Sequence, residues 1–201
     1  MLTATDLACS RGERQLFEGL CFALEAGQWL HVKGENGAGK TTLLRTMAGL
    51  SPADRREVRW RGADIRDRPG DYRRAFLYLG HPVCLKDELS PLENLQLALQ
   101  LDGFAPGEEV VLQALQRLGL QGREDLPSRV LSAGQRRRVL LARLLLRPAQ
   151  LWILDEPFNA LDAAATELLL SMVRGHLDAG GVAVLTSHQA MPLARSREVR
   201  L

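Results

Sequence analysis

A glycine-rich loop constrains this chain more than any other feature of its sequence. It reads Gly34-Glu35-Asn36-Gly37-Ala38-Gly39-Lys40-Thr41 and fits the pattern G-x-x-x-x-G-K-[ST], between a predicted strand and a predicted helix. Glycines let backbone N–H groups approach phosphate oxygens closely, and the following helix directs its positive N-terminal end at the same anion. We therefore predict a nucleoside triphosphate site in which Lys40 reaches the β- and γ-phosphates and the Thr41 hydroxyl binds Mg²⁺.

Composition indicates one globular domain with a sizeable core, because 46% of the 201 residues are hydrophobic. The 26 Lys and Arg nearly balance the 24 Asp and Glu, which excludes a strongly basic nucleic-acid tail and an acidic disordered segment. The three cysteines, Cys9, Cys21 and Cys84, form no CxxC pair, as expected for a reduced intracellular chain. Without a signal-peptide pattern or an apolar run of roughly 20 residues, we expect a soluble protein, or one held to a membrane by something else.

Strands alternate with helices along the chain, which predicts an α/β fold with a parallel sheet. From Pro91 to Leu146 the leucines recur at helical spacing and indicate a helical insert that packs them into a core. The remaining elements are predicted as strands at 20–24, 29–33, 57–60, 75–79, 151–155, 182–186 and 198–201, and helices at 39–48 and 161–177.

Two adjacent carboxylates end the apolar run Leu151-Trp152-Ile153-Leu154-Asp155-Glu156. They fall at the carboxyl end of a strand, where open parallel sheets bind ligands. Asp155 can hold the Mg²⁺ shell there, and Glu156 can polarise the attacking water. The phosphate-binding loop alone fits a transporter ATPase, a kinase or a GTPase, whereas a proton acceptor beside the γ-phosphate favours hydrolysis. The alternative, that these carboxylates merely begin a loop, is weakened by the phosphate-binding loop upstream.

A third motif, Leu131-Ser132-Ala133-Gly134-Gln135, precedes a leucine-rich helix that starts near Arg136. Small residues with a serine at a helix start describe either an anion site or an N-cap. By themselves, these residues favour the N-cap.

Five motifs resemble those of ATP-binding cassette (ABC) proteins in order and rough spacing. They are GENGAGKTT, which extends the loop to Thr42, then LSAGQ, LWILDEP, NALD and TSH. The resemblance covers essentially the whole chain and implies a single ABC-type P-loop NTPase domain over residues 1–201. It implies a nucleotide-binding core at about 1–85 and 149–201, with a mixed or parallel sheet and an N-terminal antiparallel β subdomain, and a helical insert at about 86–148.

The resemblance also implies a head-to-tail homodimer that sandwiches two ATP molecules with Mg²⁺. Each nucleotide would contact the phosphate-binding loop of one subunit and the LSAGQ motif of the other, with Ser132 facing the γ-phosphate. The turn Asn159-Ala160-Leu161-Asp162 would carry contact between the two sites. His188 would touch the γ-phosphate and help to orient Glu156 and the water.

Two positions depart from the ABC pattern. Where the family usually has an aromatic ring that stacks on adenine, this chain has Cys9-Ser10-Arg11-Gly12. Arg11 can lie over the adenine as a planar cation, or it can be a solvated surface residue. Where the family usually has a Gln that meets Mg²⁺ and relays motion to the membrane subunit, counting back from the helix start at Pro91 places His81.

The amino-acid sequences of several segments indicate a particular subgroup of the ABC family. RGER, YLGH and LSAGQRRRVLLARLLL are similar to the ATPase subunits of the cytochrome c maturation system, also described as haem-exporter ATP-binding proteins. This implies a peripheral protein on the cytoplasmic face of a bacterial inner membrane, partnered by CcmB and CcmC membrane subunits. Its ATP hydrolysis would be linked to release of a haem-loaded chaperone. The chain itself has no CxxCH, and we predict that it binds nucleotide but not haem.

Two other classes of ABC protein fit this sequence less well. A DNA-repair cassette would carry a long coiled coil before LSAGQ, and a translation cassette would carry two domains in one chain, whereas we expect neither feature here. Arg136-Arg137-Arg138 favours a solvated face or a partner contact over a nucleic-acid patch. The alternative that stays open is an ATPase subunit of a transporter for another cargo, because the five shared motifs are silent on cargo.

Overall fold

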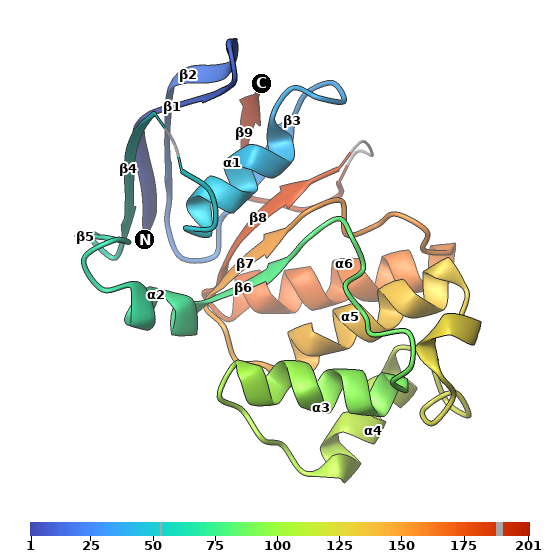
Figure 1. Cartoon of the computed structure of the whole chain (residues 1–201). Helices are drawn as coiled ribbons and strands as arrows, with labels where there is room; N and C mark the ends of the chain where they lie inside the picture. Colours follow the sequence, from blue (N-terminus) through green and yellow to red (C-terminus); the bar gives the residue numbers. More distant parts are fainter. Residues whose placement is uncertain (53, 188–190) are drawn as a thin grey trace. The chain divides into compact units, whose positions relative to one another are not determined.

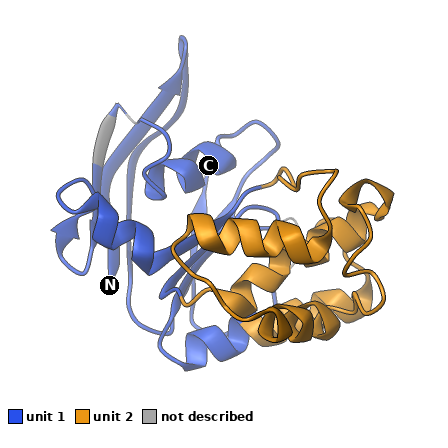
Figure 2. Cartoon of the chain, turned by 60° about the horizontal axis from the view of Figure 1, so that its bottom comes forward, with its two compact units in different colours: residues 1–80, 149–157, 173–201 blue, residues 81–148, 158–172 orange. Residues whose placement is uncertain are grey.

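The computed structural model describes residues 1–52, 54–187 and 191–201. The chain forms two compact units, shown in different colours in Figure 2. The first, here called the sheet unit, comprises Met1–Gly80, Ala149–Pro157 and Val173–Leu201. The second, the helical unit, comprises His81–Pro148 and Phe158–Met172. Among the described residues, no helix is long and apolar enough to cross a bilayer.

One sheet of the sheet unit is antiparallel, with strand order β2-β1-β4-β5 (Figure 1). Its strands are β1 (Leu2–Arg11), β2 (Arg14–Leu24), β4 (Arg55–Trp60) and β5 (Ala63–Asp64). β1 and β2 form a hairpin that pairs Leu2 with Leu24 at one end and Arg11 with Arg14 at the other. This sheet confirms the predicted N-terminal antiparallel β subdomain.

The other sheet is parallel, with strand order β6-β7-β8-β3-β9. Its strands are β3 (Trp29–Lys33), β6 (Phe76–Leu79), β7 (Leu151–Leu154), β8 (Val182–Thr186) and β9 (Ser196–Arg200). Every residue of β7 and β8 is buried, as a continuous apolar run predicts for a strand covered on both faces. The α/β fold class predicted from the sequence is therefore confirmed.

Helix α1 (Lys40–Met47) lies between the two sheets (Figure 1) and shares one core with them. Leu43, Leu44 and Met47 are fully buried there, with Leu7 of β1 and Leu30 of β3. Burial of each such side chain stabilises the fold by about 1.5–3 kcal/mol. Because this core fixes α1 against the end of β3, it also fixes the loop between them.

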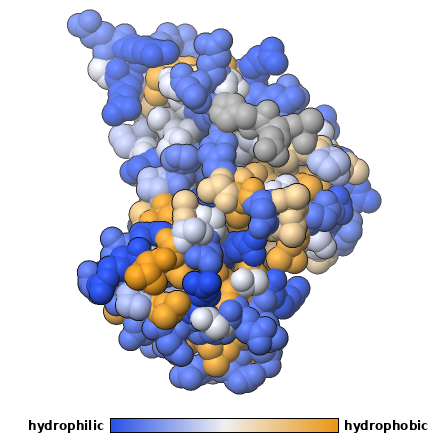
Figure 3. Space-filling view, turned by 90° about the vertical axis from the view of Figure 1, so that its right-hand side faces the viewer, coloured by the Kyte–Doolittle hydropathy of each residue, from blue (hydrophilic) through white to orange (hydrophobic). Residues whose placement is uncertain are grey.

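The helical unit contains α3 (Pro91–Leu101), α4 (Glu108–Arg117), a 3-10 turn (Ser128–Val130) and α5 (Ala133–Leu146). The three α-helices pack against one another in pairs. Helix α6 (Ala163–Asp178) begins in this unit and ends in the sheet unit. The predicted leucine stripes are buried, as Leu95, Leu99 and Leu115 show. Leu101, Val110, Leu126 and Val130 of this unit are exposed. Figure 3 shows apolar surface interspersed with hydrophilic surface on one face of the molecule.

Among the described residues, the elements that the sequence did not predict are β1, β5, helix α2 (Pro69–Ala75) and the 3-10 turn at Ser128–Val130. The register of β1 against β2 shifts three times, so its burial pattern does not alternate and its period is hidden in the sequence. Helix α2 begins with Pro69-Gly70, a dipeptide that is typical of turns, so its sequence does not indicate a helix. It ends at Ala75, which was predicted as the first residue of a strand.

Candidate functional site

The phosphate-binding loop joins β3 to α1 and depends on its glycines. Gly37 and Gly39 have φ angles of +82° and +106°, in the left-handed region that favours glycine. A Cβ on Gly34 would lie 2.9 Å from the carbonyl oxygen of Leu201, and one on Gly39 would lie 3.0 Å from Leu16 Cβ. Gly39 is the N-cap of α1 and has no side chain to cover the first N–H groups of the helix, so these groups are oriented toward an anion.

Lys40 places a buried ammonium group against the same loop. Its side chain is 8% exposed, and Nζ donates to the carbonyl oxygens of Gly34 at 2.8 Å and Glu35 at 3.2 Å. Glu35, Asn36 and the rest of the loop tip are exposed. The loop therefore combines backbone N–H donors, a helix N-terminus and the positively charged Lys40 ammonium group. This combination suits a polyphosphate ligand.

Asp155 follows β7 and is 1% exposed. A buried carboxylate is costly unless it is hydrogen-bonded, and two hydroxyl groups donate to this one. Thr41 Oγ1 donates to Asp155 Oδ2 at 2.7 Å, and Thr186 Oγ1 donates to Oδ1 at 2.9 Å. The fold thus joins the start of α1 to the carboxyl ends of β7 and β8.

The Thr41 hydroxyl and the Asp155 carboxylate form a pair of oxygen donors that fits Mg²⁺. This ion takes oxygen ligands and is usually bound by one or two protein groups together with substrate phosphates and water. Among the described residues, no group of three or more His, Cys, Asp or Glu side chains could hold a metal by itself. Any Mg²⁺ here would therefore be shared with the phosphates.

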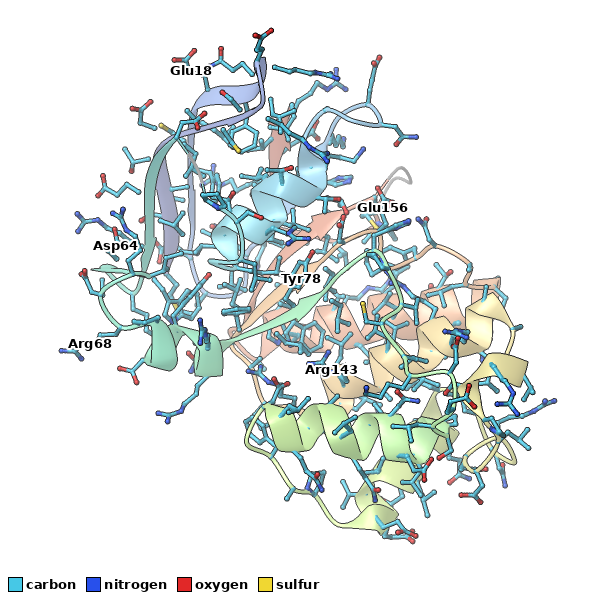
Figure 4. All side chains as sticks on the ribbon, viewed as in Figure 1. Glu18, Asp64, Arg68, Tyr78, Arg143 and Glu156 are labelled. Carbon is cyan, nitrogen blue, oxygen red and sulfur yellow. The ribbon has the colours of Figure 1, made fainter. Side chains whose placement is uncertain are left out.

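Glu156 is half-buried at the carboxyl end of the parallel sheet (Figure 4). Its φ angle is +48°, a region that costs a non-glycine residue about 1–3 kcal/mol. The Glu156 N–H donates to Thr186 Oγ1 at 2.7 Å, which helps to hold this backbone in place. A carboxylate held at the end of the sheet from which the phosphate-binding loop starts can accept a proton from a water molecule.

Thr186, the first residue of the TSH motif, is the residue of this cluster to which the sequence analysis assigned no role. It ends the apolar strand β8 and its side chain is fully buried. A hydroxyl at the end of a buried apolar strand is the signal that could have suggested a role for it. His31 lies nearby, with Nε2 3.1 Å from the Ser187 carbonyl oxygen. His188, expected at the γ-phosphate, lies outside the described residues.

A cleft of about 860 Å³ opens beside the phosphate-binding loop. Three basic side chains line it, those of Arg14, Lys33 and Arg200, together with loop residues such as Asn36. Arg11 lies at the exposed end of the β1–β2 hairpin and is not among the described residues that line this cleft.

Within the helical unit, Ser132 is the N-cap of α5 and forms a capping box with Gln135. Ser132 Oγ accepts from the Gln135 N–H at 3.2 Å, and Gln135 Oε1 accepts from the Ser132 N–H at 2.9 Å. The N-cap interpretation is confirmed. Because Ser132 Oγ serves as an acceptor in the cap, its own proton is still available to a further ligand.

The turn Asn159–Asp162 packs against the start of α5 in the same unit. Ala160 has a φ angle of +63°. Asp162 Oδ1 accepts from the Ala165 N–H at 2.8 Å, which makes Asp162 a cap for the start of α6. Its Oδ2 accepts from Arg138 Nη2 at 2.5 Å. The turn is therefore tied both to the helix that follows it and to α5.

The helical unit also brings His81 next to these motifs. The His81 carbonyl accepts from Nη1 of Arg137 at 3.4 Å, and Arg137 is 3% exposed. The segment at His81, the start of α5 and the Asn159–Asp162 turn together line a cavity of about 250 Å³. Its lining includes His81, Val83, Ala133, Arg137, Asn159 and Ala160.

Comparisons with known proteins agree with this geometry. The ABC transporter family profile matches residues 17–159. The chain is 50% identical over 203 aligned positions, covering 100% of both chains, to the cytochrome c biogenesis ATP-binding export protein CcmA of Dechloromonas aromatica. Among solved structures, a putative ABC transporter ATP-binding protein from Pyrococcus furiosus matches with a TM-score of 0.84, 23% identity, and coverage of 98% and 96% of the two chains. An ATP-binding cassette solved as a dimer in a post-hydrolysis state with ADP and Pi matches with a TM-score of 0.82, 22% identity, and coverage of 94% and 88%.

Proposed function

This chain belongs to the ABC transporter family, and we propose that it is the ATP-hydrolysing subunit of a membrane complex for c-type cytochrome biogenesis. One observation carries the ATPase activity: the Thr41 and Asp155 oxygens and the Glu156 backbone form a single hydrogen-bonded cluster at the end of the parallel sheet. The full-length similarity to a cytochrome c biogenesis ATP-binding protein supports the cellular role.

Hydrolysis follows from the roles of the described residues. The loop from Gly34 to Thr42 and the Lys40 ammonium bind the β- and γ-phosphates and keep the γ-phosphorus in line with a water molecule. Glu156 accepts a proton from this water as its oxygen bonds to the γ-phosphorus. The bond from that phosphorus to the bridging oxygen breaks, and ADP and phosphate leave. Mg²⁺ held by Thr41 and Asp155 would neutralise charge on the phosphate oxygens.

Two copies of the chain would complete each site. In this arrangement Ser132 of the second copy donates its free hydroxyl proton to the γ-phosphate, with neighbouring contacts from Leu131 to Gln135. The Asn159–Asp162 turn carries contact between the two sites, and His188 contacts the γ-phosphate. The dimer in the ADP- and Pi-bound neighbour supports this proposal, which needs ATP to favour the closed state over the open one.

The proposal extends to partners and location. Residues 1–201 act as one ATP-binding domain with a nucleotide-binding core at about 1–85 and 149–201 and a helical insert at about 86–148. The chain is peripheral, on the cytoplasmic face of a bacterial inner membrane, and the insert relays closure to integral membrane subunits of the CcmB and CcmC type. His81 meets Mg²⁺ and takes part in that relay, and Arg11 lies over the adenine. Hydrolysis drives release of a haem-loaded chaperone, while this chain binds no haem. A stoichiometric, His-dependent Soret band on titration of the purified protein with haem would contradict the last point.

Covalent-haem staining tests the cellular role. The only copy of the gene in the source strain is replaced by the Glu156→Gln variant, and immunoblotting verifies its expression. We expect the stained bands of c-type cytochromes to disappear. Normal bands would contradict the role in cytochrome biogenesis and assign the ATPase to a transporter of another cargo.

A further inference from the structure

The Thr186 side chain forms a bridge between Asp155 and Glu156, the two carboxylate residues that follow β7. Its hydroxyl donates to Asp155 Oδ1 at 2.9 Å and accepts from the Glu156 N–H at 2.7 Å. The pairing of Leu154 with Leu185 in the parallel strands β7 and β8 sets this position, because it places the next residue of each strand side by side. Among the described residues, these two are the only hydrogen-bond partners of the Thr186 side chain.

The direction of these bonds is fixed by chemistry. A hydroxyl has one proton, and a backbone N–H can only donate, so Thr186 must accept from Glu156 and give its proton to Asp155. The side chain is fully buried and β-branched, so its rotamer is restricted. One rigid hydroxyl therefore fixes one oxygen of Asp155 and the backbone of Glu156 together.

The backbone of Glu156 needs such a partner. Its φ angle of +48° is sparsely populated by residues other than glycine, and such conformations persist only where the surroundings hold them. The Thr186 hydroxyl accepts from the N–H of this strained residue and so helps to hold its backbone.

We propose that Thr186 is a positioning residue for ATP hydrolysis, whose hydroxyl holds the Asp155 carboxylate and the strained Glu156 backbone in their reactive arrangement. This inference rests on the proposed ATPase function. It predicts that loss of the hydroxyl lowers kcat and leaves ATP binding by the phosphate loop nearly unchanged.

The test compares Thr186→Val, which removes the hydroxyl at nearly constant volume, with Thr186→Ser, which keeps it. In the full chain with Mg²⁺, we expect kcat to fall about 10-fold or more in the Val variant, with KM for ATP changed less than about 3-fold. The Ser variant should stay within about 3-fold of the wild-type kcat. If Val does not fold, Thr186→Cys takes its place, because a thiol is a weak donor. The kcat of the Thr186→Cys variant should then fall clearly below the kcat of the Thr186→Ser variant.

A second readout does not depend on activity. Hydrogen exchange of the Glu156 amide, followed by NMR without nucleotide, should accelerate about 10-fold or more in the Val variant and not in the Ser variant. Thr46→Val is the matched control, since Thr46 on α1 is also fully buried and its hydroxyl has no hydrogen-bond partner among the described residues. We expect wild-type kcat and wild-type Glu156 exchange for this control.

Each outcome has a distinct meaning. A Val or Cys variant with wild-type kcat and exchange would overturn the role of Thr186 while the ATPase proposal stands. Equal losses in the Val and Ser variants, or a loss of ATP binding that matches the loss of kcat, would assign Thr186 a merely structural role. An inactive wild-type protein with intact Mg²⁺-ATP binding would instead contradict the proposed ATPase function.

Discussion

Gly134 lies so close to Ala160 that a Cβ on Gly134 would be 2.7 Å from the Ala160 carbonyl oxygen. Real Cβ atoms essentially never approach another atom so closely. The Ala160 carbonyl belongs to the backbone, so it cannot rotate away as a flexible side chain could. The start of α5, with Ser132 as its cap, therefore rests directly on the Asn159–Asp162 turn. The two motifs proposed to meet the second copy are held as one surface.

Replacing Gly134 with Ala should separate these motifs and weaken dimer formation. We expect ATP-dependent dimerisation, measured by light scattering in the Glu156→Gln background, to weaken about 10-fold or more, the scale of one or more lost packed contacts. ATP binding by the monomer should be unchanged. Gly175→Ala is the control, because a Cβ there has no neighbour within 4 Å and Ala should stabilise α6 by about 0.5–1 kcal/mol. Unchanged dimerisation in Gly134→Ala would contradict the proposed interface.

The Thr41 hydroxyl should matter for Mg²⁺ and not for the phosphate loop itself. Thr41→Val keeps the shape of the side chain and removes the oxygen that donates to Asp155. We expect the Mg²⁺ concentration needed for tight ATP binding, measured by calorimetry, to rise about 10-fold, comparable to the loss of one charge-assisted interaction. Thr41→Ser retains the oxygen and should behave as wild type. An equal Mg²⁺ requirement in the Val and wild-type proteins would exclude Thr41 as a ligand.

His176 should make folding stability depend on pH. Its ring stacks on Trp152 with centroids 3.9 Å apart, and Nε2 lies 3.1 Å from the Val182 carbonyl oxygen. Burial lowers the pKa of His176 below its usual 6.5, against the smaller opposing effect of backbone hydrogen bonds. The unfolded chain therefore binds a proton that the folded chain resists. Stability from this group is complete above pH 6.5 and is lost as the pH falls from there toward the folded pKa.

Urea unfolding of the wild type and of His176→Phe at several pH values measures this effect. The Phe variant keeps a stacked ring and cannot titrate. Below the usual pKa, the wild type should lose up to about 1.4 kcal/mol more per pH unit than the variant. Parallel stability curves for the two proteins would show that His176 does not contribute.

The parts of the site that lie in continuous sequence were predictable. The segment from Gly34 to Thr41 has a local sequence pattern that is typical of one backbone geometry. The run from Leu151 to Glu156 predicts both a buried strand and the position of its carboxyl end. The strands 29–33 and 182–186 have the predicted bounds, because buried parallel strands are apolar throughout. Ser132 was correctly interpreted as an N-cap, since capping depends only on neighbouring residues.

Relationships across the chain were not predictable. Thr186 contacts Asp155 only because β8 pairs with β7 in one register, and the backbone of Glu156 shows its positive φ angle only in the folded chain. Gly134 looked like one small residue in a motif, although its role follows from a contact with Ala160, 26 positions later in the chain. Long-range pairing is a property of topology, so no local pattern contains it.

Phosphate release by the purified chain with Mg²⁺ and ATP, compared between the wild type and Glu156→Gln, tests the central claim most directly. ATP binding is measured on the same samples. Because a positioned general base contributes about 10²–10⁴-fold, we expect hydrolysis in the variant to fall at least about 100-fold while its ATP affinity stays at the wild-type level. A variant that binds ATP and releases phosphate at the wild-type rate would contradict the assignment of Glu156 and the mechanism built on it.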